Sequence, residues 1–121
     1  MAIRLILAIH VLLVSGWFGS GAIAAPTQGG CPTGSMKATQ YSVGSGTASG
    51  QAFRPDGLTA AHKKLPFGTR VKLTNPRTGA STVVTINDRG PFTRGRDIDL
   101  SRGAARAIGL TSVGTVCAEI L

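Results

Sequence analysis

The stretch Arg70-Val71-Lys72-Leu73-Thr74, followed by Thr82-Val83-Val84-Thr85-Ile86, has the clearest secondary-structure pattern in the chain. Polar and apolar residues alternate in the first segment, which is the period of a strand with one buried face. Asn-Pro-Arg-Thr-Gly, residues 75–79, separates the two segments and is rich in residues that favour turns. The pattern predicts a β-hairpin and a fold that is mainly β.

A short helix and a last strand are predicted after this hairpin. Ser101 is a good N-cap, residues 102–108 can form two helical turns, and Gly109 can close them. Residues 113–121 return to an alternating β pattern. Several short strands with one short helix within residues 37–121 predict a single domain that forms a small closed barrel rather than a sandwich.

The first part of the chain has the features of an export signal. A basic start is followed by a mostly apolar run over residues 5–18 and by the small-x-small pattern Ala22-Ile23-Ala24. The run is shorter than the roughly 20 residues of a membrane span. We therefore expect residues 1–24 to be a cleaved signal peptide with no stable membrane anchor afterwards. Residues 25–36, rich in Pro, Gly, Thr and Ser, are expected to form a flexible lead-in.

The charge balance indicates a polyanionic partner. The chain has 13 Lys and Arg against five Asp and Glu. Nucleic acid would be the usual partner of such a protein in the cytoplasm. Export instead favours an anionic cell envelope with carboxylate-bearing peptidoglycan, and no nucleic acid partner is expected. The alternative is that the charge only keeps a small secreted domain soluble.

Two cysteines remain after the expected cleavage, Cys31 and Cys117. An even count in an exported chain favours a disulfide, which would stabilise the domain by on the order of 4 kcal/mol in the chain-entropy model. The alternative, a lipid-modified Cys31, is disfavoured because Gln28-Gly29-Gly30 precedes it. Two distant cysteines and one remaining histidine, His62, make no plausible ligand cluster, so no metal site and no cofactor are expected.

The run Ile86-Asn87-Asp88-Arg89-Gly90-Pro91-Phe92 offers a candidate for acid chemistry. Asp88 follows an apolar strand and precedes a Gly-Pro turn, which would hold its side chain rigidly at a barrel rim. The alternative is that Asp88 accepts hydrogen bonds from backbone amides in an Asx-type turn. Arg89, Arg94 and Arg96 follow closely, and they would favour the ionised carboxylate if they pointed at it.

Several motifs together resemble a known family. They are Thr47-Ala48-Ser49-Gly50, Leu58-Thr59-Ala60-Ala61-His62, Leu65-Pro66-Phe67-Gly68-Thr69-Arg70-Val71, Asn87-Asp88-Arg89-Gly90-Pro91-Phe92 and Gly95-Arg96-Asp97-Ile98-Asp99-Leu100-Ser101. In this order, over residues 38–121, the chain resembles the rare lipoprotein A family of septal ring lytic transglycosylases. The resemblance implies a six-stranded double-psi β-barrel, a fold shared with barwin and with the first domain of expansins. It also implies cleavage of peptidoglycan glycan strands with 1,6-anhydro-muramic ends.

The resemblance also implies roles for five residues. Asp88 would be the single acid and base, because the 6-hydroxyl of the sugar captures the anomeric carbon and no water needs activation. His62 would lie beside it and bind substrate or orient Asp88, unless it is only a structural residue. Gln51, Thr59 and Arg89 would contact the glycan, Arg89 as an anion contact. Gln51 departs from the family, in which a Glu follows Thr-Ala-Ser-Gly, and an amide cannot transfer a proton.

Two other functions are compatible with a barrel of this kind. One is a non-catalytic wall-binding or wall-loosening module like the expansin barrel. The other, a barwin-type defence protein, is disfavoured because the additional disulfides of barwin are missing. In each case we expect a monomer that is periplasmic or secreted. Asp99 is expected to be structural, pairing with an arginine or capping the helix, and Asp97 is expected to be solvent-exposed.

Overall fold

The computed structural model describes residues 30–121 except 43 and 45. The described residues form six strands and one helix in the order β1 Ser35–Tyr41, β2 Thr59–His62, β3 Arg70–Thr74, β4 Ser81–Asp88, β5 Ile98–Ser101, α1 Arg102–Ala107 and β6 Gly114–Ile120. The expected signal peptide, residues 1–24, lies outside this part of the chain. Within it, no helix is long and apolar enough to cross a membrane.

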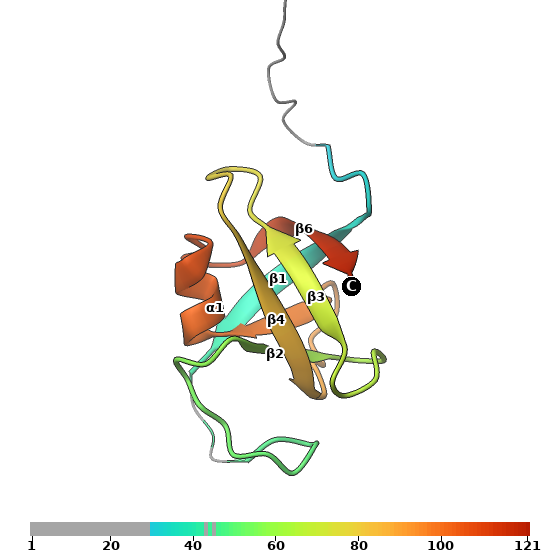
Figure 1. Cartoon of the computed structure of the whole chain (residues 1–121), viewed down its shortest axis with the longest axis vertical. Helices are drawn as coiled ribbons and strands as arrows, with labels where there is room; N and C mark the ends of the chain where they lie inside the picture. The colour runs from blue at the N-terminus through green and yellow to red at the C-terminus, as the bar shows by residue number, and fades with distance from the viewer. Residues whose placement is uncertain (1–29, 43, 45) are drawn as a thin grey trace, which may run out of the picture.

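The six strands close into a barrel in the order β1-β5-β2-β4-β3-β6 (Figure 1). The pairs β1·β5 and β2·β4 are parallel, whereas the other four pairs are antiparallel. The predicted hairpin is confirmed as β3 and β4, in which Val71 lies opposite Val84. The closed barrel with one short helix confirms the expected fold class.

Alternate residues of the strands fill the barrel. The largest fully buried apolar side chains are Val71, Leu73, Val84, Ile86, Ile98, Leu100, Ile108 and Val116. Helix α1 contributes Ala104 and Ala105 to the same core. The alternation that predicted the hairpin therefore separates the buried face of each strand from the solvated one.

The start of the described chain is tied to the last strand by the expected disulfide. Cys31 and Cys117 form a disulfide. β1 begins at Ser35, inside the segment expected to be a flexible lead-in, because Ser35 and Met36 pair with β6. The disulfide and this pairing together order the chain before residue 37.

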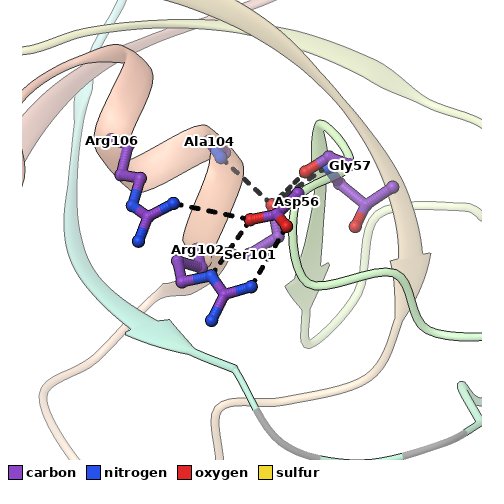
Figure 2. Close-up of polar contacts among 7 residues, drawn as sticks. Asp56, Gly57, Ser101, Arg102, Ala104 and Arg106 are labelled. Atoms are coloured by element: carbon purple, nitrogen blue, oxygen red, sulfur yellow. Dashed lines mark hydrogen bonds and ion pairs between the residues drawn. The ribbon is translucent and has the colours of Figure 1, made fainter.

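The loop between β1 and β2 lies at the lower end of the barrel in Figure 1, where β4 terminates, and it is fastened to α1. The Asp56 carboxylate accepts hydrogen bonds from Nε and Nη2 of Arg102 at 3.0 and 3.1 Å. Nη1 of Arg106 lies 3.7 Å from the same carboxylate (Figure 2). Gly103 packs so closely on the Asp56 backbone carbonyl that a Cβ there would overlap it. We call Asp56, Arg102, Gly103 and Arg106 the Asp56 clasp.

Ser101 caps α1, as predicted. Its hydroxyl accepts a hydrogen bond from the Ala104 N–H at 3.2 Å and donates one to the Gly57 carbonyl (Figure 2). The helix ends at Ala107, and Ile108 is its C-cap. Asp99, for which capping was one expected role, does not cap the helix, because it lies in β5 before the N-cap.

Candidate active site

Four strands place Asp88 and Asp99 on one face of the sheet. Ala61 of β2 pairs with Asp88 of β4 on one side and with Asp99 of β5 on the other. Asp99 in turn pairs with Thr39 of β1. Residues paired in register project to the same face, so the two carboxylates flank the small Ala61 side chain, with Cα atoms about 10 Å apart. We call Thr39, Ala61, Asp88 and Asp99 the carboxylate row.

A β-bulge at the end of β4 places Asp88 in this row. Ala60 pairs with Ile86 but Ala61 pairs with Asp88, so Asn87 is the extra residue. Without the extra residue, the alternation of a strand would turn Asp88 to the side of the core residue Ile86. Bulges often re-aim side chains next to active sites in this way.

One oxygen of Asp88 is held by the backbone. Oδ1 accepts hydrogen bonds from the Ala48 N–H at 2.8 Å and from the Arg89 N–H at 2.9 Å. Asp88 is therefore an acceptor for backbone amides, which was the structural alternative for this residue. Among the described residues, Oδ2 has no hydrogen-bond partner, so the fixed carboxylate keeps one oxygen for another contact.

Asp99 and Tyr41 both have a raised pKa near Asp88. Burial raises the pKa of Asp99, as does the charge of Asp88, whereas a hydrogen bond of 2.7 Å from Thr39 Oγ1 and the charge of Arg96 act against the rise. Burial, together with the charges of Asp88 and Asp99, raises the pKa of Tyr41 to about 12. The Tyr41 hydroxyl lies beside Asp88, but it does not meet the geometry of a hydrogen bond with any described residue.

His62 is fixed by the turn that follows β2. Its Nδ1 accepts hydrogen bonds from the N–H groups of Lys64 and Leu65, both at 3.0 Å. Burial lowers the pKa of His62, and the positive charges of Arg89 and the two lysines after His62 lower it further, against the opposing effect of Asp97. His62 is thus a neutral side chain that has Nε2–H as its donor. Because Nδ1 accepts these two hydrogen bonds, it does not form one with Asp88.

Arg89 is turned away from the Asp88 carboxylate. Its Nη1 donates hydrogen bonds to the carbonyl oxygens of His62, at 3.3 Å, and of Leu65, at 2.9 Å. The guanidinium carbon lies 4.0 Å from the centre of the Phe67 ring. The structure therefore holds the Arg89 charge in the turn instead of placing it against Asp88.

A pocket of about 390 Å³, which we call the Gln51 pocket, is lined by Asn87, the residue before Asp88, and by two of the predicted binding residues. Its walls are Gln51, Ala52, Arg54, Gly57, Thr59 and Asn87. Nδ2 of Asn87 donates a hydrogen bond of 3.2 Å to Oε1 of Gln51. Gln51 and Thr59 thus share one pocket, and Asn87 joins this pocket to the carboxylate row.

The sequence model of the family described as "Lytic transglycolase" matches residues 33–120. This match covers most of the chain and the whole barrel. The chain belongs to the lytic transglycolase family. The carboxylate row, the His62 turn and the Gln51 pocket all lie within the matched residues.

Relatives share the barrel segment of the chain. A protein named probable endolytic peptidoglycan transglycosylase RlpA from Nostoc sp. is 60% identical over 78 residues, which is 64% of this chain and 21% of that protein. A protein of the same name from Synechocystis sp. is 65% identical over 77 residues, 62% of this chain and 24% of that protein. The endolytic peptidoglycan transglycosylase RlpA of Pasteurella multocida is 53% identical over 77 residues, 62% of this chain and 26% of that protein. The chain therefore spans about a fifth to a quarter of the length of these relatives.

A solved structure shows the same fold. Streptomyces papain inhibitor superposes with a TM-score of 0.52 and 22% sequence identity, covering 74% of this chain and 98% of the inhibitor. At this identity the likeness concerns the barrel architecture alone.

Two residues near Asp88 were not predicted as part of the candidate site. Asp99 was expected to be structural, but it lies across Ala61 from Asp88, and Tyr41, for which the sequence predicted no role, lies near both carboxylates. Asp97 is exposed, as expected, but its carboxylate also accepts a hydrogen bond of 2.8 Å from the Lys37 N–H. The alternation of β5, with Ile98 and Leu100 buried, already indicated that Asp99 faces away from the core. What lies opposite Asp99 depends on pairing with β1 and β2, which no local pattern specifies.

Proposed function

We propose that this chain cleaves peptidoglycan glycan strands as a lytic transglycosylase, with Asp88 as both acid and base. The environment of Asp88 carries the proposal: Oδ1 is held by the backbone, Oδ2 has no hydrogen-bond partner among the described residues, and the preceding residue, Asn87, lines the Gln51 pocket. The transglycosylase names of the relatives support the same reaction class.

In the proposed reaction, protonated Asp88 gives its proton to the glycosidic oxygen, and the bond from the anomeric carbon to that oxygen breaks. The 6-hydroxyl of the same sugar attacks the anomeric carbon and returns its proton to Asp88. The product is a 1,6-anhydro ring, and no water is consumed. One carboxyl group thus serves both steps, so the amide at Gln51 does not prevent them.

The surrounding residues would support these steps. Burial and the charge of Asp88 raise the pKa of Asp99, which favours the protonated form of Asp99. Nε2–H of His62 is available to donate to a sugar hydroxyl. Gln51 and Thr59 would bind the glycan from the pocket, and Arg89 would contact an anionic group through N–H groups other than those on Nη1.

The compartment and the state of the protein are part of the proposal. A structural disulfide, Cys31–Cys117, fits an oxidising compartment, so we place the protein in the periplasm or outside the cell. We propose that it acts as a monomer on glycan strands and not on nucleic acid. Residues 1–24 would serve as the signal peptide.

One observation favours a second candidate, a non-catalytic wall-binding module like the expansin barrel. The family Glu is an amide here, and Gln51 accepts a hydrogen bond from Asn87. This pair can bind sugar hydroxyls but cannot carry a proton. A barrel with this pocket would bind glycans even if Asp88 did no chemistry.

Digestion of purified sacculi, and separately of peptide-stripped glycan strands, distinguishes these functions by mass spectrometry of the products. A transglycosylase yields new 1,6-anhydro ends. New reducing ends would instead indicate hydrolysis, with Asp99 as the second carboxylate. Binding without any new ends would identify the wall-binding module.

A further inference from the structure

Phe92 is the most exposed of the large hydrophobic residues among those described, with 84% of its surface accessible. It follows Asp88 by four residues. Its ring lies against Gly90, with ring carbons 3.5 and 3.6 Å from where a Cβ of Gly90 would be. A ligand that covers this ring would remove its apolar surface from water, which is favourable.

The Arg89 side chain, three residues before Phe92, is fixed by several contacts. Phe67 is 41% exposed, and the Arg89 guanidinium lies over its ring. Two carbonyl oxygens, those of His62 and Leu65, hold Nη1 of the same guanidinium. Arg89 follows Asp88 directly and precedes Phe92 by three residues, so this stacked pair is fixed on the segment that joins the acid to Phe92.

We propose that Phe92 is a sugar-stacking residue, which binds the apolar face of a pyranose ring next to the bond that Asp88 cleaves. The Phe67–Arg89 pair is the wall of this subsite. The inference rests on the proposed function, since it names how the same groove holds a glycan strand.

The chemistry of the surroundings selects a sugar as the occupant. A pyranose exposes C–H groups on its faces and hydroxyls at its rim, which suits one aromatic ring among polar and charged groups. Arg89 and the exposed Arg94 suit the carboxylates of an acidic glycan. A protein partner would need a contiguous apolar patch of several hundred Å². The other exposed large hydrophobic residues besides Phe67 belong to other segments: Leu58, Val113, Ile120 and Leu121.

Binding to peptide-stripped glycan strands tests the inference when it is measured with Asp88→Asn, so that cleavage does not interfere. In this background we expect Phe92→Ala to weaken binding about tenfold, in line with the effect of removing one stacking ring. Phe92→Trp should keep the affinity, because it keeps a ring. Phe92→Leu should lose most of it, although it stays apolar. Ile120→Ala, a matched exposed position, should change nothing.

Kinetics on the active protein give an independent readout. Phe92→Ala should raise KM for soluble glycan oligomers about tenfold and leave kcat nearly unchanged, because stacking acts before and during bond cleavage alike.

Other outcomes overturn the inference. Equal affinity of Phe92→Ala and its parent for glycans would exclude stacking while leaving the proposed function intact. Phe92-dependent binding to vesicles of phosphatidylglycerol and phosphatidylcholine, with glycan binding unchanged, would make the ring a membrane contact. Phe92-dependent dimers in sedimentation, again with glycan binding unchanged, would make it a contact between copies. If the parent protein binds no glycan at all, the proposed function and the inference both fail.

Discussion

Aspartate side chains have opposite surroundings in the Asp56 clasp and in the carboxylate row. Asp56 is exposed and pairs with two arginines, and hydrogen bonding and charge from Arg102 lower its pKa. Asp88 and Asp99 are half-buried and are held by N–H groups and a hydroxyl, and burial raises the pKa of Asp99. Among the described residues, the only salt bridges are those of Asp56.

The difference distinguishes a structural carboxylate, Asp56, from the carboxylates of the candidate site. An arginine pair fixes a carboxylate in its ionised form, which suits a link between a loop and a helix. Asp88, the proposed acid, has no such arginine pair among the described residues. The clasp in turn fastens the loop that carries the Gln51 pocket and the Ala48 N–H that holds Asp88.

The largest expected effect is that of Asp88→Asn on glycan cleavage. We expect a loss of roughly 100- to 10,000-fold, the usual contribution of a general acid or base. The fold should be kept, because the Asn oxygen can still accept both N–H groups. Release of 1,6-anhydro ends measures the activity, and chemical denaturation measures the stability. Asp56→Asn is the matched control and should retain activity. Unchanged cleavage by Asp88→Asn would contradict the role of Asp88.

Gly103→Ala tests how much the clasp depends on close backbone contact. The added Cβ would overlap the Asp56 carbonyl, so we expect a loss of about 1–3 kcal/mol in the free energy of unfolding, as for overpacked sites. Without the overlap, the change would stabilise the helix by up to about 1 kcal/mol. Urea denaturation measures whether the variant is less or more stable than the parent protein. Gly46→Ala, where a Cβ meets nothing within 4 Å, serves as the comparison.

Asp99→Asn should change the pH dependence of stability. A carboxyl group with a raised pKa in the folded protein stabilises the fold at low pH, and this contribution is lost as pH rises from 3.8 through the raised pKa. The variant should therefore gain stability relative to the parent protein as pH rises through this window, and the difference should then level off. Denaturation series from pH 3 to pH 8 measure it. The same gain in Asp97→Asn, an exposed neighbour, would show that the effect is not specific to Asp99.

Asp56→Asn should have the smallest effect. Exposed ion pairs contribute little to stability, so we expect a change close to the error of a denaturation measurement, and one that disappears at high salt. Digestion of the β1–β2 loop by a protease is the more sensitive measurement, and it should become slightly faster. A large, salt-independent loss of stability would show that the clasp is more than a surface pair.

Local patterns in the sequence predicted much of this molecule. Alternation gave the β3–β4 hairpin and its core face, because side chains of a strand alternate between two sides whatever the strand pairs with. Ser101 was identified as the N-cap and the two cysteines as a pair for equally local reasons, residue type and count. Asp88 was predicted to be the candidate acid because it belongs to a recognisable motif and precedes a Gly-Pro turn.

Only the tertiary structure decided what surrounds Asp88. Asp99 and Tyr41 lie near it because β2 pairs with both β4 and β5, and β5 pairs with β1, in the closed barrel. Ala48 reaches it from a loop 40 residues earlier. The Asp56 clasp likewise joins residues 46 positions apart. The sequence by itself determined which residues face the core and which acid ends a strand. The order and register of the strands are set by pairing between distant segments. This pairing determined which groups lie near Asp88.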